Sequence, residues 1–180
     1  MSIRLPLIFL WLLVHFSCNQ VQKVTDSIPS ELIDSSKTAK STEEQLVLPA
    51  KVIGIVDGDT VDVLYHDLPL RIRMEHIDAP EKRGKQAFGN KAKLVISDLC
   101  FGQNINLLTD GKFDMGGRLI AEILNEEGIN VNKEMVRLGY AWHFKKYSTE
   151  MSYDVLEMEA RKARRGLWQG ENPIAPWDFR

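Results

Sequence analysis

Residues 46–80 read LVLPAKVIGIVDGDTVDVLYHDLPLRIRMEHIDAP, and this stretch decides the predicted fold. It contains three segments rich in Val, Ile and Leu, separated first by an Asp-Gly turn and then by a His-Asp turn. In the second and third segments apolar and polar residues alternate, which is typical of a β-strand with one buried face. Pro80 cannot continue a central strand, so the third strand is predicted to end near Ile77. The stretch therefore predicts three consecutive strands.

Beyond Pro80 the hydrophobic spacing changes from two to between three and four, which predicts a helix over residues 88–99. Apolar runs at 105–108 and 119–124 predict two more strands, and helices are predicted over 132–138 and about 150–165. Five strands with a helix after the third predict an α+β fold. We expect a five-stranded closed barrel of the oligonucleotide-binding type (OB-fold) with three α-helices over residues 46–180.

The two later helices carry recognisable end signals. Asn132 is predicted to cap the first of them and Gly139 to close it, while Gly166 is predicted to end the second. The apolar side of that last helix is predicted to consist of Val155, Leu156, Met158, Ala160 and Ala163.

Composition excludes several classes of protein. The chain has 180 residues, of which 44% are hydrophobic and 27% charged, with a formal net charge of −2. These values are ordinary for a globular domain, so whole-chain disorder, a collagen-like repeat and a multi-span membrane protein are excluded. Two cysteines cannot form a disulfide scaffold. The absence of a basic excess does not exclude a nucleic-acid binder, because the field depends on where charges lie.

The first 45 residues differ from the rest. Arg4 precedes an apolar run over residues 5–14 that ends at Ser17-Cys18, and the run is shorter than the roughly 20 residues of a membrane span. Residues 1–18 thus resemble a bacterial lipoprotein signal in which Cys18 is acylated. Ordinary signal cleavage and an uncleaved anchor are the alternatives. Residues 19–45 are polar and predict a flexible tether. We expect an exported protein, held at the bacterial cell envelope membrane by lipidated Cys18, and otherwise secreted or periplasmic.

Acidic residues gather at the ends of the predicted strands. Residues 57–60, Asp-Gly-Asp-Thr, form a tight turn, and residues 77–81, Ile-Asp-Ala-Pro-Glu, follow the third strand. Taken singly, each has an ordinary structural explanation as a hairpin turn or a helix entry. Together, Asp59 and Asp78 offer the hard anionic oxygens that Ca²⁺ prefers. The carbonyl of Ala79, which precedes a proline, can point away from the strand and act as a further ligand.

Two arginines and a glutamate complete a candidate set for phosphodiester cleavage. Arg73 and Arg118 are planar donors that suit a phosphate, although a lone arginine on a strand is ordinarily a solvated charge. Glu81 is a carboxylate that could take a proton from a water. A cation on the phosphate, donors for the growing charge and an oriented nucleophile are the parts that this reaction needs.

With these residues the sequence resembles the staphylococcal (micrococcal) nuclease, or thermonuclease, family. The order and spacing of the motifs at 57–60, at Arg73 with 77–81 and at Gly117-Arg118 all match. So do Gly139-Tyr140-Ala141-Trp142 and the later Gly166-Leu167-Trp168…Pro173…Pro176-Trp177. The resemblance covers about residues 46–180.

The resemblance implies an OB-fold barrel and a Ca²⁺-dependent endonuclease that hydrolyses DNA and RNA and leaves 3′-phosphate products. It implies that Asp59 and Asp78 bind Ca²⁺, with the Ala79 carbonyl as a further ligand. Glu81 would be the general base. Arg73 and Arg118 would stabilise the transition state.

Departures from the family pattern affect the expected substrate contacts. Met115 and Gly116 stand where the family often has a basic residue and a tyrosine, so a phosphate contact is expected to be lost. Phe144 replaces a frequent tyrosine, and Tyr147 is the candidate substitute for its hydroxyl. Lys85, from a basic loop, completes the predicted substrate-binding set. Basic and aromatic groups interleaved in this way suit single-stranded or locally unpaired DNA and RNA, and we expect a monomer.

Three functions compete at this point. One is an exported nuclease, the second a nucleic-acid-binding barrel that has lost catalysis, and the third a tethered Ca²⁺-binding or adhesion protein. The third explains the two aspartates but not the arginines. A binding module has no need for two metal ligands, a base and two arginines together, so the sequence favours the nuclease.

Overall fold

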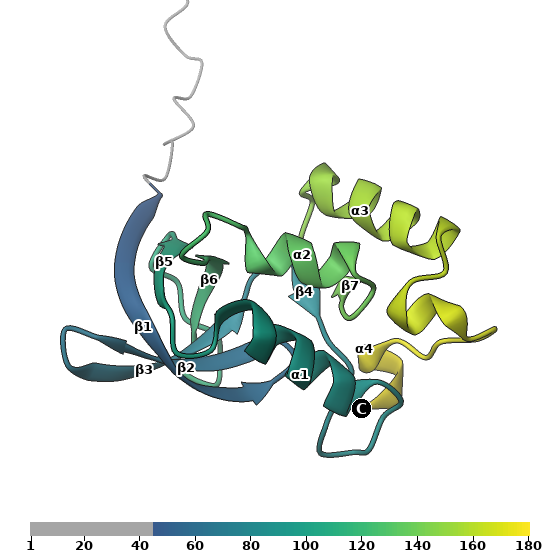
Figure 1. Cartoon of the computed structure of the whole chain (residues 1–180), viewed down its shortest axis with the longest axis horizontal. Helices are drawn as coiled ribbons and strands as arrows, with labels where there is room; N and C mark the ends of the chain where they lie inside the picture. The colour runs from purple at the N-terminus through teal and green to yellow at the C-terminus, as the bar shows by residue number, and fades with distance from the viewer. Residues whose placement is uncertain (1–44) are drawn as a thin grey trace, which may run out of the picture. The chain divides into compact units, whose positions relative to one another are not determined.

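Strand β1 (Leu46–Asp57) is long enough to pair along both of its edges, and this closes a barrel. In the computed structural model, which describes residues 45–180, β1 pairs with β2 (Thr60–Tyr65) at one edge and with β5 (Asn104–Thr109) at the other. Its pairing with β2 is irregular near Gly54 and near Asp57, and bulges of this kind bend a strand. Figure 1 shows β1 curving along the barrel wall.

The remaining strands complete the barrel in the order β1-β2-β3-β6-β5. Strand β3 (Leu68–Met74) pairs antiparallel with β2 and parallel with β6 (Leu119–Leu124), and β6 pairs antiparallel with β5. The prediction of an α+β fold built on a five-stranded OB-type barrel is therefore confirmed. Alternate residues of the strands face inward and form the fully buried core: Val52, Val61, Val63, Ile72, Met74, Ile105, Leu107, Leu119, Ala121 and Ile123.

The three predicted helices are present, and they lie on one side of the barrel (Figure 1). They are α1 (Gly89–Cys100), α2 (Val131–Arg137) and α3 (Met151–Lys162). Two short elements that the sequence did not predict follow α3, a 3₁₀ turn η1 (Gly166–Gln169) and α4 (Pro176–Phe179).

The predicted third strand divides into two elements. β3 ends at Met74, the chain turns through His76 with a left-handed backbone (φ 66°), and a separate strand β4 (Ile77–Asp78) begins. β4 pairs antiparallel with β7 (Trp142–His143), outside the barrel. This small ladder places Asp78 opposite Trp142 and connects the barrel to the segment that precedes α3.

The predicted cap of α2 is wrong by two residues. The side chain of Asn130, not Asn132, accepts a hydrogen bond from the amide of Lys133. Asn132 is fully buried, where its Oδ1 accepts from the Ile123 amide and its Nδ2 donates to the carbonyls of Glu75 and Ala121. Both asparagines suit a cap by residue type, and tertiary contacts decide between them.

The buried face of α3 also differs from the predicted one. Of the predicted residues, Ala160 is buried and Leu156 half-buried, whereas Val155, Met158 and Ala163 are exposed. Tyr153 and Glu157, which were not predicted, are buried. The helix buries a glutamate because its carboxylate accepts from the His143 amide at 2.9 Å, and a partner of this kind offsets the desolvation of a charge. The helix is also shorter than predicted, since it is capped by Glu150 and ends at Lys162, before Gly166.

The predicted signal segment (1–18) and, apart from Gln45, the predicted tether (19–45) lie outside the described residues. Within residues 45–180, none of the helices combines the length and the hydropathy that a membrane span requires.

The two asparagines of α2 give a stability test. Asn132→Ala should lower the free energy of unfolding by about 2–4 kcal/mol, because it removes the side-chain partner of the Ile123 amide and of the Glu75 carbonyl, whereas the Ala121 carbonyl still accepts from the Glu75 amide. Asn130→Ala removes the cap and should cost about 1 kcal/mol. Urea denaturation of both variants measures the difference, and equal losses would contradict the assignment of the cap to Asn130.

Candidate active site

The turn between β1 and β2 packs directly against the segment that follows β4. Gly58 makes this contact possible, because a Cβ atom there would lie 2.8 Å from the Cβ atoms of both Ala79 and Ala92. Only glycine tolerates so close an approach. As a result Asp59 reaches the β4 segment, where its Oδ2 accepts a hydrogen bond from the Ala79 amide at 3.0 Å.

Arg73, near the end of β3, lies between the two predicted metal-binding carboxylates. Its Nη2 is 3.0 Å from Oδ1 of Asp78 and 3.4 Å from Oδ2 of Asp59. Its Nη1 donates to the carbonyls of Met74 and Ile77, both at 2.8 Å. The side chain is only 13% exposed, so this guanidinium is held in place by four partners. The structure thus brings Asp59, Asp78 and Arg73 together.

The two aspartates repel each other in a buried place. Asp78 is fully buried and Asp59 nearly so. Burial, and secondarily the charge of Asp59, raises the pKa of Asp78 to about 6, although Arg73 and Arg180 act in the opposite direction. The two arginines therefore do not fully offset the cost of charging Asp78 here. A buried carboxylate whose pKa is raised in this way, beside a second carboxylate and two arginines, is a functional-site candidate.

Arg118 approaches the same turn from the loop before β6. Its Nη1 lies 3.3 Å from the Thr60 hydroxyl, which in turn donates to Oδ1 of Asp59 at 2.9 Å. Asp114 orients Arg118, with its Oδ2 at 2.6 Å from Nη2 and 2.7 Å from Nε. Asp114 also accepts from the amides of Gly116 and Arg118, which fixes the loop. Asp114 is not among the residues predicted from the sequence, although an aspartate four residues before an arginine in a glycine-containing loop is a usable signal.

Glu81 lies beside Asp78 and is paired with a residue that the sequence analysis did not select. Nη1 of Arg180 is 2.6 Å from Oε1 of Glu81, and Nη2 of Arg180 is 2.5 Å from Oδ2 of Asp78. About a hundred residues separate Arg180 from these carboxylates in the sequence, so no local pattern could have indicated the contact. Five predicted residues, Asp59, Asp78, Glu81, Arg73 and Arg118, therefore meet at one site with Arg180 and Asp114.

Comparison with known proteins accounts for this arrangement. Residues 71–170 match the family model described as staphylococcal nuclease homologue. The chain belongs to the staphylococcal nuclease family. The matched stretch includes Arg73, Asp78, Glu81 and Arg118, while Asp59 precedes it.

Individual relatives agree with the family match. A micrococcal nuclease of Shigella flexneri is 37% identical over 140 residues, which cover 72% of this chain and 79% of the relative. An uncharacterized endonuclease of Escherichia coli O157:H7 is 38% identical over 130 residues, covering 72% and 83%. A probable staphylococcal-like nuclease of Oryza sativa subsp. japonica is 34% identical over 130 residues, covering 72% and 33%. Together with the family model, these similarities support a nuclease, that is, a phosphodiester hydrolase.

Nucleases of this family use a metal ion, and the donor set here fits one. Among residues 45–180 there is no cluster of three or more His, Cys, Asp or Glu side chains suited to a metal. What the fold provides is two aspartates within reach of one Arg73 nitrogen, whose mutual repulsion a divalent cation would relieve. Two carboxylates also leave positions for backbone carbonyl, water and substrate oxygens, as Ca²⁺ sites commonly do.

The predicted substrate-binding residues fall on two loops. Lys85 lies in the exposed loop over residues 81–88, with a left-handed backbone (φ 56°). Phe144 and Tyr147 follow β7 and contact each other edge to face, with centroids 4.9 Å apart. Trp177 of α4 stacks on Phe144 with nearly parallel rings, 5° apart. One face of Phe144 is therefore covered, whereas Tyr147 is 70% exposed.

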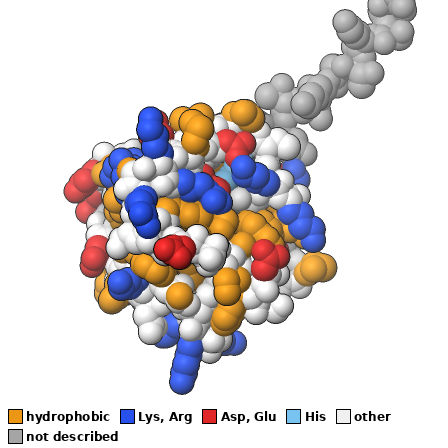
Figure 2. Space-filling view, turned by 90° about the vertical axis from the view of Figure 1, so that its right-hand side faces the viewer, with side chains coloured by type: hydrophobic (Ala, Val, Ile, Leu, Met, Phe, Trp, Pro, Cys, Tyr) orange, Lys and Arg blue, Asp and Glu red, His pale blue; other side chains and the backbone are white. Residues whose placement is uncertain are grey.

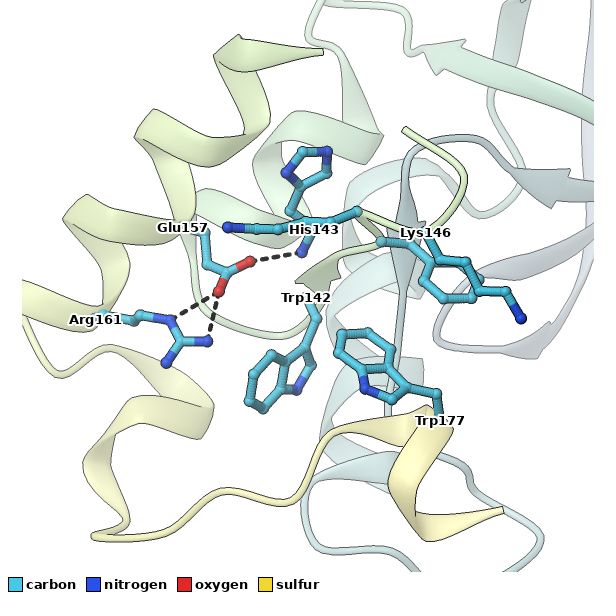
Figure 3. A pocket seen from close by; sticks show the side chains of 8 residues that line it. Trp142, His143, Lys146, Glu157, Arg161 and Trp177 are labelled. Carbon is cyan, nitrogen blue, oxygen red and sulfur yellow. Dashed lines mark hydrogen bonds and ion pairs between the residues drawn. The ribbon is translucent and has the colours of Figure 1, made fainter. Parts of the chain in front are cut away.

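A pocket of about 660 Å³ opens beside these aromatic rings (Figure 3). Figure 2 shows the side of the molecule that faces right in Figure 1, where hydrophobic side chains form a central band with Lys and Arg around it. In the pocket Arg161 pairs with Glu157 and lies over the ring of Trp142. Aromatic and basic residues, together with Glu157, line its wall: Trp142, His143, Phe144, Lys145, Lys146, Glu157, Arg161 and Trp177.

Because the charged form of Asp78 is unfavourable in the folded protein, replacing this carboxylate by a neutral amide should stabilise the metal-free nuclease. A group whose pKa rises from 3.8 to about 6 on folding makes the folded state less stable as pH increases between these values. Asp78→Asn should therefore raise the free energy of unfolding at pH 7 by about 1–3 kcal/mol, with little gain at pH 4. Urea denaturation in EGTA measures this.

Asp62→Asn is the matched control, since Asp62 pairs with Arg71 at the surface and should contribute at most about 1 kcal/mol. An Asp78→Asn protein that is less stable than the parent at pH 7 would contradict the repulsion argument.

Proposed function

We propose that this protein is a Ca²⁺-dependent endonuclease that hydrolyses DNA and RNA in single-stranded or locally unpaired regions and leaves 3′-phosphate products. The observation that carries the proposal is the position of Arg73 between the buried Asp59 and Asp78, with Glu81 alongside. A module that only binds nucleic acid gains nothing from burying two repelling carboxylates.

Each residue of the site has a role in this reaction. Asp59 and Asp78, with the carbonyl of Ala79, would hold a Ca²⁺ ion, which when bound would supply positive charge to the phosphate. Glu81 takes a proton from the attacking water, whose oxygen bonds to phosphorus as the bond to the 5′-oxygen breaks. The departing 5′-oxygen takes a proton from solvent water, and the phosphate stays on the 3′ side.

The two arginines stabilise the charge that develops on the phosphate. Arg118 is 35% exposed and directed at the β1–β2 turn by Asp114, so it can reach a substrate without rearrangement. Arg73 is more deeply placed, and its guanidinium, oriented by Asp59 and Asp78, would face a phosphate bound beside these carboxylates. Oriented donors of this kind supply much of the catalytic effect of such sites.

Single strands suit the aromatic surface beside the site. Bases stack on exposed rings without regard to sequence, and basic groups follow the phosphates. Tyr147 presents the exposed ring in this region, with the ammonium group of Lys146 5.3 Å from its centroid. Phe144, one face of which is covered by Trp177, packs against Tyr147. Lys85, in the loop over residues 81–88, would contact a phosphate of the bound nucleic acid.

Cleavage of a single-stranded oligonucleotide tests the proposal. The parent should cut with Ca²⁺ and not in EGTA, while Glu81→Gln should lose about 10²- to 10⁴-fold in rate, the usual contribution of a general base. Binding of a nucleoside 3′,5′-bisphosphate to that variant should stay within about tenfold of the parent, because the base acts in the transition state.

Glu127→Gln, in an exposed turn, is the matched control and should cut at the parental rate. Cleavage by the parent that persists in chelator would exclude the metal mechanism, and binding without any cleavage would make the protein a binding module.

Export and membrane attachment through Cys18 belong to the same proposal and rest on residues 1–18. Cys18→Ala should abolish labelling by radioactive palmitate and shift the processed protein to the soluble fraction, because an acyl chain is what holds it at the bilayer. Fractionation with Cys100→Ala as the matched control measures this. Label retained by the Cys18 variant would contradict the assignment.

A further inference from the structure

The segment over residues 171–180, which contains α4 and which we term the α4 segment, packs against the loop that carries Glu81. The link to the backbone of that loop is the buried side chain of Gln86. Its Oε1 accepts from the Glu81 amide at 2.8 Å, and its Nε2 donates to the Ile174 carbonyl at 2.8 Å. A single amide therefore connects the backbone of Glu81 to the α4 segment.

A second contact lies farther along the same loop. A Cβ atom at Gly84 would lie 2.5 Å from the ring of Phe179, so the loop backbone and the α4 segment are already in close contact. Because Gln86 and Gly84 are both engaged, the eight residues from 81 to 88 are restrained at two points by the α4 segment.

The third contact involves the carboxylate of Glu81 itself. One arm of the Arg180 guanidinium reaches Oε1 of Glu81 at 2.6 Å and the other reaches Oδ2 of Asp78 at 2.5 Å. Asp78 is fully buried and its other oxygen is held by Arg73, so it is a fixed point. Arg180 thus ties Glu81 to a buried aspartate that is itself paired with Arg73.

The α4 segment is itself anchored, so that Arg180 is presented from a packed element. Ala175 is buried in a cluster with Trp142 and Trp168, and Trp177 contacts both Trp142 and Phe144. Trp142 belongs to β7 and lies opposite Asp78 in the β4–β7 ladder, so the α4 segment packs next to the acidic site. An ion pair held by such packing restricts its partner more than one between two flexible surface chains does.

We propose that Arg180 is a positioning residue that, together with Gln86, holds the Glu81 carboxylate in its working orientation. This inference rests on the proposed function, in which Glu81 is the base. A base must lie within hydrogen-bond reach of the water that it deprotonates, and a displacement of about 1 Å can cost about 10²-fold in rate. Arg180 acts through Glu81 and does not itself contact the substrate.

The kinetic test uses the full chain and four variants, Arg180→Met, Arg180→Lys, Glu81→Gln and the double variant Arg180→Met/Glu81→Gln. Arg180→Met should lower kcat about 10- to 100-fold, because Glu81 is no longer oriented. KM should stay within about threefold of the parent, since ground-state binding is unaffected. The kcat of Arg180→Lys should lie between that of the parent and that of Arg180→Met, because lysine keeps the positive charge but lacks the planar guanidinium that donates to both carboxylates.

The double variant separates positioning from direct contact with the substrate. If Arg180 acts through Glu81, its loss should change the rate of the Glu81→Gln protein by no more than about twofold. Additive losses, or a KM that rises while kcat is kept, would overturn the proposal in favour of phosphate binding by Arg180. A faster Arg180→Met enzyme would overturn it in favour of a blocking role.

Arg137→Met is the matched control, since Arg137 is 45% exposed, as is Arg180, and pairs with Glu134 on α2 away from the site. This variant should keep parental kcat and KM. Unchanged thermal unfolding of Arg180→Met, compared with Arg137→Met, shows that a loss of kcat is not a loss of fold.

A measurement that needs no nuclease activity distinguishes failure of this inference from failure of the proposed function. The loop carries three exposed trypsin sites, at Lys82, Arg83 and Lys85. Cleavage there should be about three- to tenfold faster in Arg180→Met and in Gln86→Leu than in the parent or in Arg137→Met, because local opening becomes easier. Equal tryptic rates would overturn the restraint even where Glu81→Gln proves inactive, and faster cleavage supports it even where the parent cuts no nucleic acid.

Discussion

The contact of one buried guanidinium with two buried carboxylates is the constraint on which the rest of this structure depends. Asp59 and Asp78 could not be charged side by side in the interior without Arg73, whose Nη2 lies 3.4 and 3.0 Å from them. The other arm of Arg73 holds the chain where β3 ends and β4 begins, through the carbonyls of Met74 and Ile77. Fold and site are thus joined at one side chain.

The elements around this contact all serve to keep it in place. Gly58 lets the β1–β2 turn close on Ala79, and the β4–β7 ladder holds Asp78 opposite Trp142. Even so, burial leaves the pKa of Asp78 raised, so the metal-free protein retains a cost that a cation would remove. Relief of this cost on binding would add to the affinity of the site for a divalent cation.

The departures from the family pattern lie where the structure can accommodate them. Met115 is fully exposed, and the amide of Gly116 donates to Asp114, which in turn orients Arg118. The loop therefore keeps its arginine in place without the usual tyrosine. On the opposite side the α4 segment adds Trp177 to the aromatic surface and Arg180 to the acidic site. The aromatic surface and the acidic site are both built by segments distant in sequence.

The sequence by itself determined the barrel and the identity of the five candidate groups, Asp59, Asp78, Glu81, Arg73 and Arg118. It could do so because strand alternation, Asp-Gly turns and closely spaced motifs are local signals that do not depend on the rest of the chain. The prediction of Asn132 as the cap of α2 was wrong, because Asn130 and Asn132 are the same residue type and differ in what surrounds them in the fold.

Only the tertiary structure decided which groups hold the candidate site together. Gln86 contacts Glu81 from 5 residues away in the sequence and Arg180 from 99 residues away. Glu157 faces inward on α3 because its carboxylate accepts a hydrogen bond from the buried His143 amide. Hydrophobic periodicity describes the average environment of a helix or strand face, whereas the burial of a charged or amide side chain depends on one partner at one distance. That partner is supplied by another part of the chain, so only the folded protein determines it.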